Sequence, residues 1–207
     1  MTAEARERYH HGDLPNALVD EAVKLLEEGG AEAFTLRELA RRVGVNHRAV
    51  YRHFEDKRAL LAVVAERGYR ALTASMQQAI EETGSKDPLE RLVAAASAYV
   101  VFGVNERARY EVMLGPRLNE DERFPPLEEA IKSTVRLLSA ELRQVAPTVP
   151  RERIRDAGIG LLAAAHGLVA LRLTRRIRIR RELLAGYTAK LLGPLVRGIL
   201  ADLGEPG

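Results

Sequence analysis

The sequence predicts an all-α protein of about nine helices. Two observations support this fold class: Ala, Leu, Glu and Arg, which have high helix propensity, dominate the composition, and no convincing strand pattern is present. A third is that Gly, Pro and capping residues divide the chain into segments of helical length. We expect a small domain of three helices at residues 1–56 and a larger helical domain at residues 57–207.

The first helix is expected from Asp13 to Gly30. Asp13 can cap its start, Pro15 is tolerated in a first turn, and Gly29 with Gly30 ends it. Its apolar stripe consists of Leu14, Leu18, Ala22, Leu25 and Leu26. One buried face is therefore predicted.

The next two helices are short and have the pattern of a helix-turn-helix. Thr35 and Glu38 form a capping box, in which the Thr hydroxyl bonds the Glu amide while the Glu carboxylate reaches back. The apolar face that follows consists of Leu36, Leu39, Ala40 and Val43. Gly44 suits a tight turn, and Asn46 caps a second helix from His47 to Phe54.

Six further helices are expected in the rest of the chain. Asp56 caps a long helix that ends near Glu82, and Asp87-Pro88 starts the next one after a polar break. Breaks at Gly115-Pro116, Phe124 to Pro126 and Pro147 to Pro150 separate the remaining helices. These are expected near 88–104, 107–114, 126–146, 151–175 and 182–202.

Composition excludes several classes of protein. There is no Cys, so disulfides and Cys-ligated zinc are excluded. The charged N-terminus is unlike a signal peptide, and the longest apolar run, Gly158 to Leu171, is too short to span a bilayer. We expect a cytoplasmic protein with no membrane partner, cofactor or metal; the adjacent His10 and His11 are weak evidence for a metal site.

The helix at 47–54 presents polar side chains opposite an apolar anchor. Val50 and Phe54, four residues apart, should be buried. His47 with Tyr51, and Arg48 with Arg52, form two adjacent polar stripes. Such a helix can read DNA, with arginine bonding guanine, although charged stripes are more often plain solvated surface.

The run from Thr35 to Phe54 (TLRELARRVGVNHRAVYRHF), closing with Asp56-Lys57 and Leu60-Leu61, resembles the DNA-binding domain of the tetracycline-repressor (TetR) family. His11 to Leu14 and the Gly29-Gly30 ending are also similar to that family. The resemblance implies that Thr35 and Lys57 contact phosphate, and that Tyr51 and His53 lie at phosphate or the groove edge. His53 also has an alternative role in packing at the helix end.

The same resemblance implies further contacts to bases or the adjacent backbone, made by Arg37, Asn46, His47, Arg48 and Arg52. Many relatives carry a small residue in place of Arg48 and Ser or Thr in place of Asn46, which leaves the base read by each side chain open. Residues 1–12 are either an arm that touches DNA or a frayed terminus.

The last two long helices are candidates for a homodimer interface. Small residues run through the first of them, and the second carries more apolar surface than one face needs. The small residues are Gly158, Gly160, Ala163, Ala164, Ala165 and Gly167, and the apolar ones are Leu183, Leu184, Tyr187, Leu191, Leu192, Leu195, Val196, Ile199 and Leu200. The resemblance implies a four-helix bundle with the partner; an ordinary monomeric core is the alternative.

Family members commonly hold a small-molecule effector among the middle helices. The residues expected to line such a pocket here are Tyr99, Phe102, Tyr110, Met113, Arg117 and His166. Their alternative role is in the core or the interface. The basic cluster from Arg172 to Arg181, which contains no acid, is expected to be a solvated loop with some bridging across the dimer.

The sequence therefore predicts a regulator of transcription that binds double-stranded DNA. Most specifically, we expect a repressor that a small-molecule effector releases from a palindromic operator. An effector-independent regulator or an activator would use the same fold. An enzyme is disfavoured because the five His are scattered and no phosphate loop, nucleophile elbow or His-Glu-x-x-His motif is present.

Overall fold

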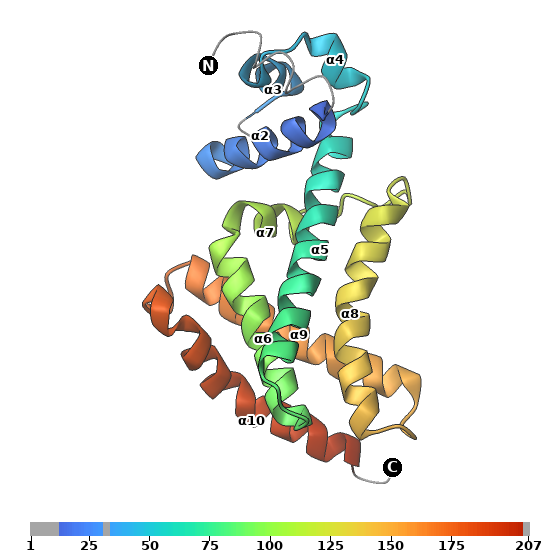
Figure 1. Ribbon diagram of the computed structural model, residues 1–207, viewed down its shortest axis with the longest axis vertical. Coiled ribbons are helices and arrows are strands. Elements are labelled where there is room, and N and C mark those ends of the chain that lie inside the picture. Colours follow the sequence, from blue (N-terminus) through green and yellow to red (C-terminus); the bar gives the residue numbers. More distant parts are fainter. Residues whose placement is uncertain (1–12, 31–33, 205–207) are drawn as a thin grey trace. The chain divides into compact units, whose positions relative to one another are not determined.

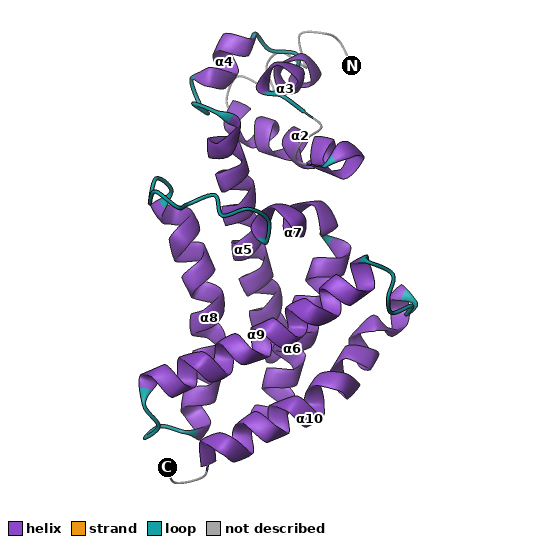
Figure 2. Ribbon diagram, turned by 180° about the vertical axis from the view of Figure 1, so that it is seen from behind, coloured by secondary structure: helices purple, strands orange, loops and turns teal. Residues whose placement is uncertain are grey.

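The computed structural model describes residues 13–30 and 34–204, and confirms the all-α prediction (Figure 1). Within these residues Figure 2 shows helices and connecting loops without a strand. The α-helices are α2 (Leu14–Gly29), α3 (Leu36–Val43), α4 (His47–Tyr51), α5 (Lys57–Glu82), α6 (Pro88–Asn105), α7 (Arg107–Met113), α8 (Pro125–Val145), α9 (Arg151–Leu173) and α10 (Leu184–Gly204).

The chain divides into two compact units, each with its own core. The first unit comprises residues 1–68 and 108–128, and the second comprises residues 69–107 and 129–207. Helix α5 contributes its first part to one unit and its remainder to the other. The boundary expected at residue 56 remains a prediction about how the chain divides functionally.

In the first unit, α2, α3 and α4 pack around apolar side chains from each helix. The buried stripe of α2 includes Leu18 and Leu26, and that of α3 includes Leu36 and Leu39. Val50 of α4 has no exposed surface. Burial of side chains of this size favours folding by roughly 1.5–3 kcal/mol each.

Two arginines tie the connection between α7 and α8 to the start of α5 in this unit. The Arg58 guanidinium donates to the Leu118 carbonyl at 2.6 Å and to the Asp121 carboxylate at 2.9 Å. Arg123 donates to Glu55 at 2.7 Å and to Asp56 at 3.3 Å. The connection is thus attached to the residues just before and just inside α5.

In the second unit, α6 packs against both α9 and α10. Apolar side chains with no exposed surface, such as Leu92 and Val196, form its interior. Polar contacts add specificity: the Arg91 guanidinium donates to the largely buried Glu141 carboxylate at 2.6 and 2.8 Å. Hydrogen-bonded charges of this kind are a stable arrangement because neither is left unpaired.

Some local expectations were wrong. The helix that starts at His47 ends at Tyr51 rather than Phe54, because the amides of His53 and Phe54 both bond the Val50 carbonyl in a tightening turn. Asp13 makes no capping hydrogen bond; its carboxylate accepts from the Asn16 side chain instead. The last helix begins at Leu184, after a short 3-10 turn at Arg181–Leu183.

Candidate nucleic-acid interface

The helix-turn-helix owes its geometry to three capping residues. The Thr35 hydroxyl accepts from the Glu38 amide at 3.2 Å, and the Asn46 side chain accepts from the Arg48 amide at 2.9 Å. Gly44 adopts the left-handed conformation, with φ of 79°, that a side chain would disfavour. Half of the expected capping box is therefore present, while the Glu38 carboxylate bonds Arg41 and Arg42 instead of reaching back.

Helix α4 and the turn after it separate apolar from polar side chains, as the sequence predicted. Val50 is 0% exposed and Phe54 is 5% exposed, so both anchor the element to the core. The polar side chains expected at DNA are exposed, and these are His47, Arg48, Tyr51, Arg52 and His53. Thr35, Arg37 and Asn46 are exposed on the neighbouring segments. This is the surface that direct readout requires.

The cations near this surface fall into two groups. Arg41, Arg42 and Arg58 form ion pairs with carboxylates of the same unit. In contrast, Arg37, Arg48 and Arg52 have no ion-pair partner among the residues that the structure describes. A negatively charged partner can therefore bind the second group without breaking an ion pair among those described residues.

Arg42 shows most clearly what the first group does. Its guanidinium donates to Glu28 of α2 at 2.7 Å and lies 3.6 Å from Glu21 of the same helix. It also lies 3.5 Å from Glu38 on its own helix. The pKa of the Glu28 carboxyl is lowered chiefly by its hydrogen bond from Arg42, and that of Glu38 chiefly by its bond from Arg41.

Lys57, expected at phosphate, is half-buried and already has a partner. Its ammonium donates to the Phe34 carbonyl at 2.8 Å and lies 4.7 Å from the centre of the Phe34 ring. An ammonium has three N–H donors, so this bond leaves others for a phosphate oxygen. The contact also fixes the residue before Thr35, a link that the sequence did not reveal.

Comparison with known proteins identifies this architecture. Residues 18–64 match the family model of bacterial regulatory proteins of the tetR family, and residues 92–190 match that of the tetracyclin repressor-like C-terminal domain. The chain belongs to the TetR family. All of the side chains expected at DNA, from Thr35 to Lys57, lie inside the first matched segment.

Individual relatives extend the match unevenly. The class A tetracycline repressor protein from transposon 1721 of Escherichia coli is 48% identical over 52 residues, 25% of this chain and 24% of that protein. Nucleoid occlusion factor SlmA of Vibrio atlanticus (strain LGP32) is 30% identical over 117 residues, 56% of this chain and 57% of that protein. The chain thus matches about a quarter of one relative's length and just over half of the other's.

Among solved structures, a protein of unknown function from Rhodococcus sp. RHA1 is similar over nearly the whole chain. It is 28% identical with a TM-score of 0.73, and the match covers 92% of this chain and 97% of that one. The two proteins therefore share one fold over nearly the whole length of both chains.

The six residues expected to line an effector pocket do not all belong to one compact unit. Tyr99, Phe102 and His166 lie in the second unit, while Tyr110, Met113 and Arg117 lie in the first. The aromatic residues and Met113 are buried, His166 is half-buried, and Arg117 is exposed. Their role in binding a ligand remains a prediction.

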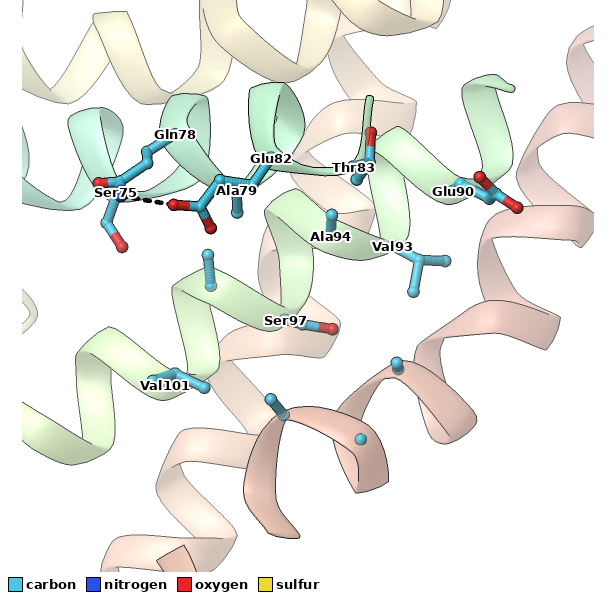
Figure 3. Close-up of a pocket in the computed structure, with 14 residues that line it drawn as sticks. Ser75, Gln78, Ala79, Glu82, Thr83, Glu90, Val93, Ala94, Ser97 and Val101 are labelled. Carbon is cyan, nitrogen blue, oxygen red and sulfur yellow. Dashed lines mark hydrogen bonds between the residues drawn. The ribbon is translucent and has the colours of Figure 1, made fainter. Parts of the chain in front are cut away.

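A groove of about 750 Å³ lies instead between α5, α6 and α10 of the second unit (Figure 3). We call it the α5–α6–α10 groove. It is lined mainly by small side chains, with polar groups from Gln78, Glu82, Glu90 and Ser97. None of the six expected pocket residues lines it, since it is built largely from Ala, Ser and Gly, which carry little signal in a sequence.

Helices α9 and α10 expose more apolar surface than the sequence suggested. By length and composition alone, the segments Arg151–Leu173 and Arg181–Gly204 could each cross a membrane. Within the chain, only 28% of the most apolar 18-residue stretch of the first segment and 22% of that of the second are buried. The expectation that no apolar segment is long enough was therefore wrong, because it counted one uninterrupted run rather than the whole helix. The core helix of a soluble protein passes the same test.

Proposed function

We propose that this TetR-family chain is a sequence-specific regulator of transcription, a cytoplasmic homodimer that represses genes by binding a palindromic operator. The observation that carries the proposal is the division of α4 into a buried apolar anchor and an exposed polar face. That face is served by three arginines with no ion-pair partner among the described residues, Arg37, Arg48 and Arg52.

The residue roles follow from their positions. Arg48 and His47, in the first turn of α4, reach base edges in the major groove, where arginine bonds guanine through two donors. Thr35 and Lys57, which lie at the starts of α3 and α5, hold phosphates on either side. Asn46, Tyr51, Arg52 and His53 complete the contact surface, with Arg37 at the adjacent backbone.

The dimer is supported by two side-chain stripes on α10. Leu184, Leu192 and Val196 are buried within the chain. Thr188 belongs to the same buried stripe. One position before each of these four residues lies an exposed stripe, 39–51% exposed, of Leu183 at the end of the 3-10 turn and Tyr187, Leu191 and Leu195 of α10. An exposed apolar row beside a buried one is typical of a helix that packs against two different partners.

Glycines on both helices agree with a close helix–helix approach. A Cβ atom added at Gly160 or Gly167 of α9, or at Gly198 of α10, would meet nothing within 4 Å in the chain. Packing inside one protomer therefore does not require these glycines. These glycines would be required if the helices of a second copy packed closely against this surface. A dimer of this kind presents two recognition helices to successive turns of DNA.

Effector control completes the proposal. A small molecule bound in the larger domain displaces α5, and the distance between the recognition helices of the dimer no longer fits the operator. Activation of transcription through the same DNA contacts is the alternative. The position of the operator relative to a promoter distinguishes repression from activation.

The test is selection of random and genomic DNA fragments by the protein, followed by sequencing, with wild type beside Arg48→Ala and Lys57→Ala. We expect one palindromic site, relaxed at one symmetric position by Arg48→Ala. Lys57→Ala should weaken all sites evenly and reduce the slope of log affinity against log salt by about 1. Lys86→Ala, an exposed lysine between α5 and α6, is the matched control.

Thermal unfolding of each variant accompanies the selection, because Lys57 also bonds the Phe34 carbonyl. A folded Lys57→Ala protein with uniformly weaker binding supports the phosphate role. If protein stripped of bound small molecules enriches no fragment even at low salt, the proposed DNA-binding function is wrong.

A further inference from the structure

The α5–α6–α10 groove has a floor of small side chains and carries two carboxylates at separate places along it, Glu82 and Glu90 (Figure 3). Ala94 and Val101 of α6 and Ala189 of α10 are among the residues that line it. Its volume of about 750 Å³ falls within the range of pockets that bind small organic molecules. No aromatic side chain lines it, so it has no surface on which a flat ring would stack.

Ser97 is the feature of the groove that packing does not explain. The residue is only 8% exposed, and its hydroxyl oxygen has no hydrogen-bond partner within residues 13–30 and 34–204. Figure 3 shows this side chain on α6 pointing toward the space in front of α10. A buried hydroxyl without a partner costs free energy, which a ligand with a hydrogen-bonding group would recover.

The charges at the groove are of one sign. Glu82 and Glu90 line it, and no Lys, Arg or His does. Glu82 accepts a hydrogen bond of 2.6 Å from the neutral Gln78 amide and has no ion-pair partner in the part of the chain that the structure describes (Figure 3). Glu90 has no ion-pair partner among the residues that the structure describes.

We propose that the α5–α6–α10 groove binds an aliphatic organic cation. Its ammonium group lies near Glu82, its hydrocarbon part lies along the Ala and Val floor, and a second donor on the ligand bonds the Ser97 hydroxyl, while Glu90 adds to the negative charge of the groove. The carboxylates select against anions of the same shape, and the lack of aromatic side chains favours a flexible chain over a planar ring system.

Binding of a cation in this groove does not depend on the proposed function. An effect of that binding on DNA affinity does rest on the proposed function. The groove includes residues of α5, the helix expected to carry the effector signal. The site is distinct from the six residues expected to line a pocket, so the two sites are tested separately.

The experiment is calorimetric titration of the full chain with decylammonium, below the concentration at which it forms micelles. Decanol and decanoate are the neutral and anionic probes of matched length. We expect saturable binding of one cation per chain, tighter than either control, and about fourfold tighter for each methylene added in a homologous series.

Three variants locate the site. Gly186→Leu should abolish binding without harming the fold, because a Cβ at Gly186 meets nothing within 4 Å and leucine favours a helix. Glu82→Gln combined with Glu90→Gln should weaken the cation about tenfold and leave decanol unchanged. Ser97→Ala should weaken an aminoalkanol, which carries a hydroxyl donor besides its ammonium, and should leave decylammonium nearly unchanged, because the only donor of decylammonium is the ammonium itself.

The matched control is Glu152→Gln, an exposed carboxylate on α9 outside the groove, which should bind as wild type does. Equal affinity for decylammonium and decanoate, or undiminished binding by a folded Gly186→Leu protein, overturns the proposal. A failure of decylammonium to bind because a second copy of the chain covers the groove also overturns the proposal. Binding that leaves operator affinity unchanged supports the site and counts against the effector mechanism alone.

Discussion

Helices α4 and α10 share one design and differ in the chemistry of their exposed face. Each has a buried apolar stripe beside an exposed stripe. On α4 the exposed side chains are polar or cationic, including Arg48 and Tyr51, whereas on α10 they are apolar, including Leu191 and Leu195. The difference indicates different partners: a polyanion for α4 and another apolar protein surface for α10.

The largest effect is expected from charging the exposed stripe of α10. Leu191→Glu combined with Leu195→Glu should convert the dimer into a folded monomer, because carboxylates cannot be buried unpaired. Operator affinity should then fall at least about 100-fold, since each chain binds one half-site alone. Analytical ultracentrifugation and operator binding measure this. Lys190→Glu, also exposed on α10, is the control, and an intact dimer in the double variant would contradict the interface.

Substitutions on the buried side and on the exposed side of α4 and the turn after it should have different effects, the first on stability and the second on DNA binding. Phe54→Ala removes a side chain that is 5% exposed and should lower the free energy of unfolding by about 3–5 kcal/mol. Tyr51→Ala removes one that is 47% exposed, and should leave stability nearly unchanged while weakening DNA binding. Chemical denaturation of both variants tests this. Similar losses of stability would mean that Tyr51 belongs to the core.

Arg48 and Arg42 should likewise differ, with Arg48 affecting DNA binding and Arg42 affecting stability. Arg48→Ala should cost about 1–3 kcal/mol of discrimination at one base pair and leave unfolding unchanged. Arg42→Ala should destabilise the contact between α2 and α3 and keep the same preferred operator, because its partners are Glu28 and Glu21. Operator-mutant binding and thermal unfolding distinguish these outcomes. Relaxed specificity in the Arg42 variant would move that residue to the DNA surface.

The smallest effect is expected from acid. Hydrogen bonds from arginine lower the pKa values of Glu28, Glu38 and Asp121 from their ordinary values of 4.5, 4.5 and 3.8. Lowered carboxyl pKa values contribute stability that is present above the ordinary values and is lost as pH falls through the lowered ones. Thermal midpoints between pH 5 and pH 3 should therefore fall less steeply in Arg42→Gln than in wild type. Parallel curves would show that the ion pairs made by Arg42 contribute nothing to stability.

Much of the fold could be predicted because the signals are local. Thr35, Asn46, Asp56 and Asp87 all cap the helices expected of them, and Gly44 has the left-handed conformation of the turn. Local signals also predicted which side of α4 is buried. They could not predict that this helix ends at Tyr51, because the backbone tightens only where Phe54 turns into the core.

Longer-range features were beyond the sequence. The groove joins segments from α5, α6 and α10, and the first of these lies more than a hundred positions before the last. Ala, Gly and Ser carry no periodic signal in the sequence. Sequence alone also could not predict the bond from Lys57 to the Phe34 carbonyl or the ion pairs that Arg42 makes with two helices. A Lys or Arg residue gives no sign in the sequence of whether a partner lies near it in the fold. The candidate DNA-binding residues were found because caps and exposed stripes are local.

The two arginines that fasten the α7–α8 connection bear on the building of hybrid regulators. A new DNA-reading segment joined at residue 56 would bring its own residues at positions 55 and 56, and Arg123 of the recipient would lose both carboxylate partners. Arg58, on the recipient side, would keep Asp121. Residues 108–128 therefore belong with the segment before residue 68, and a transplant that moves both pieces together preserves every one of these bonds.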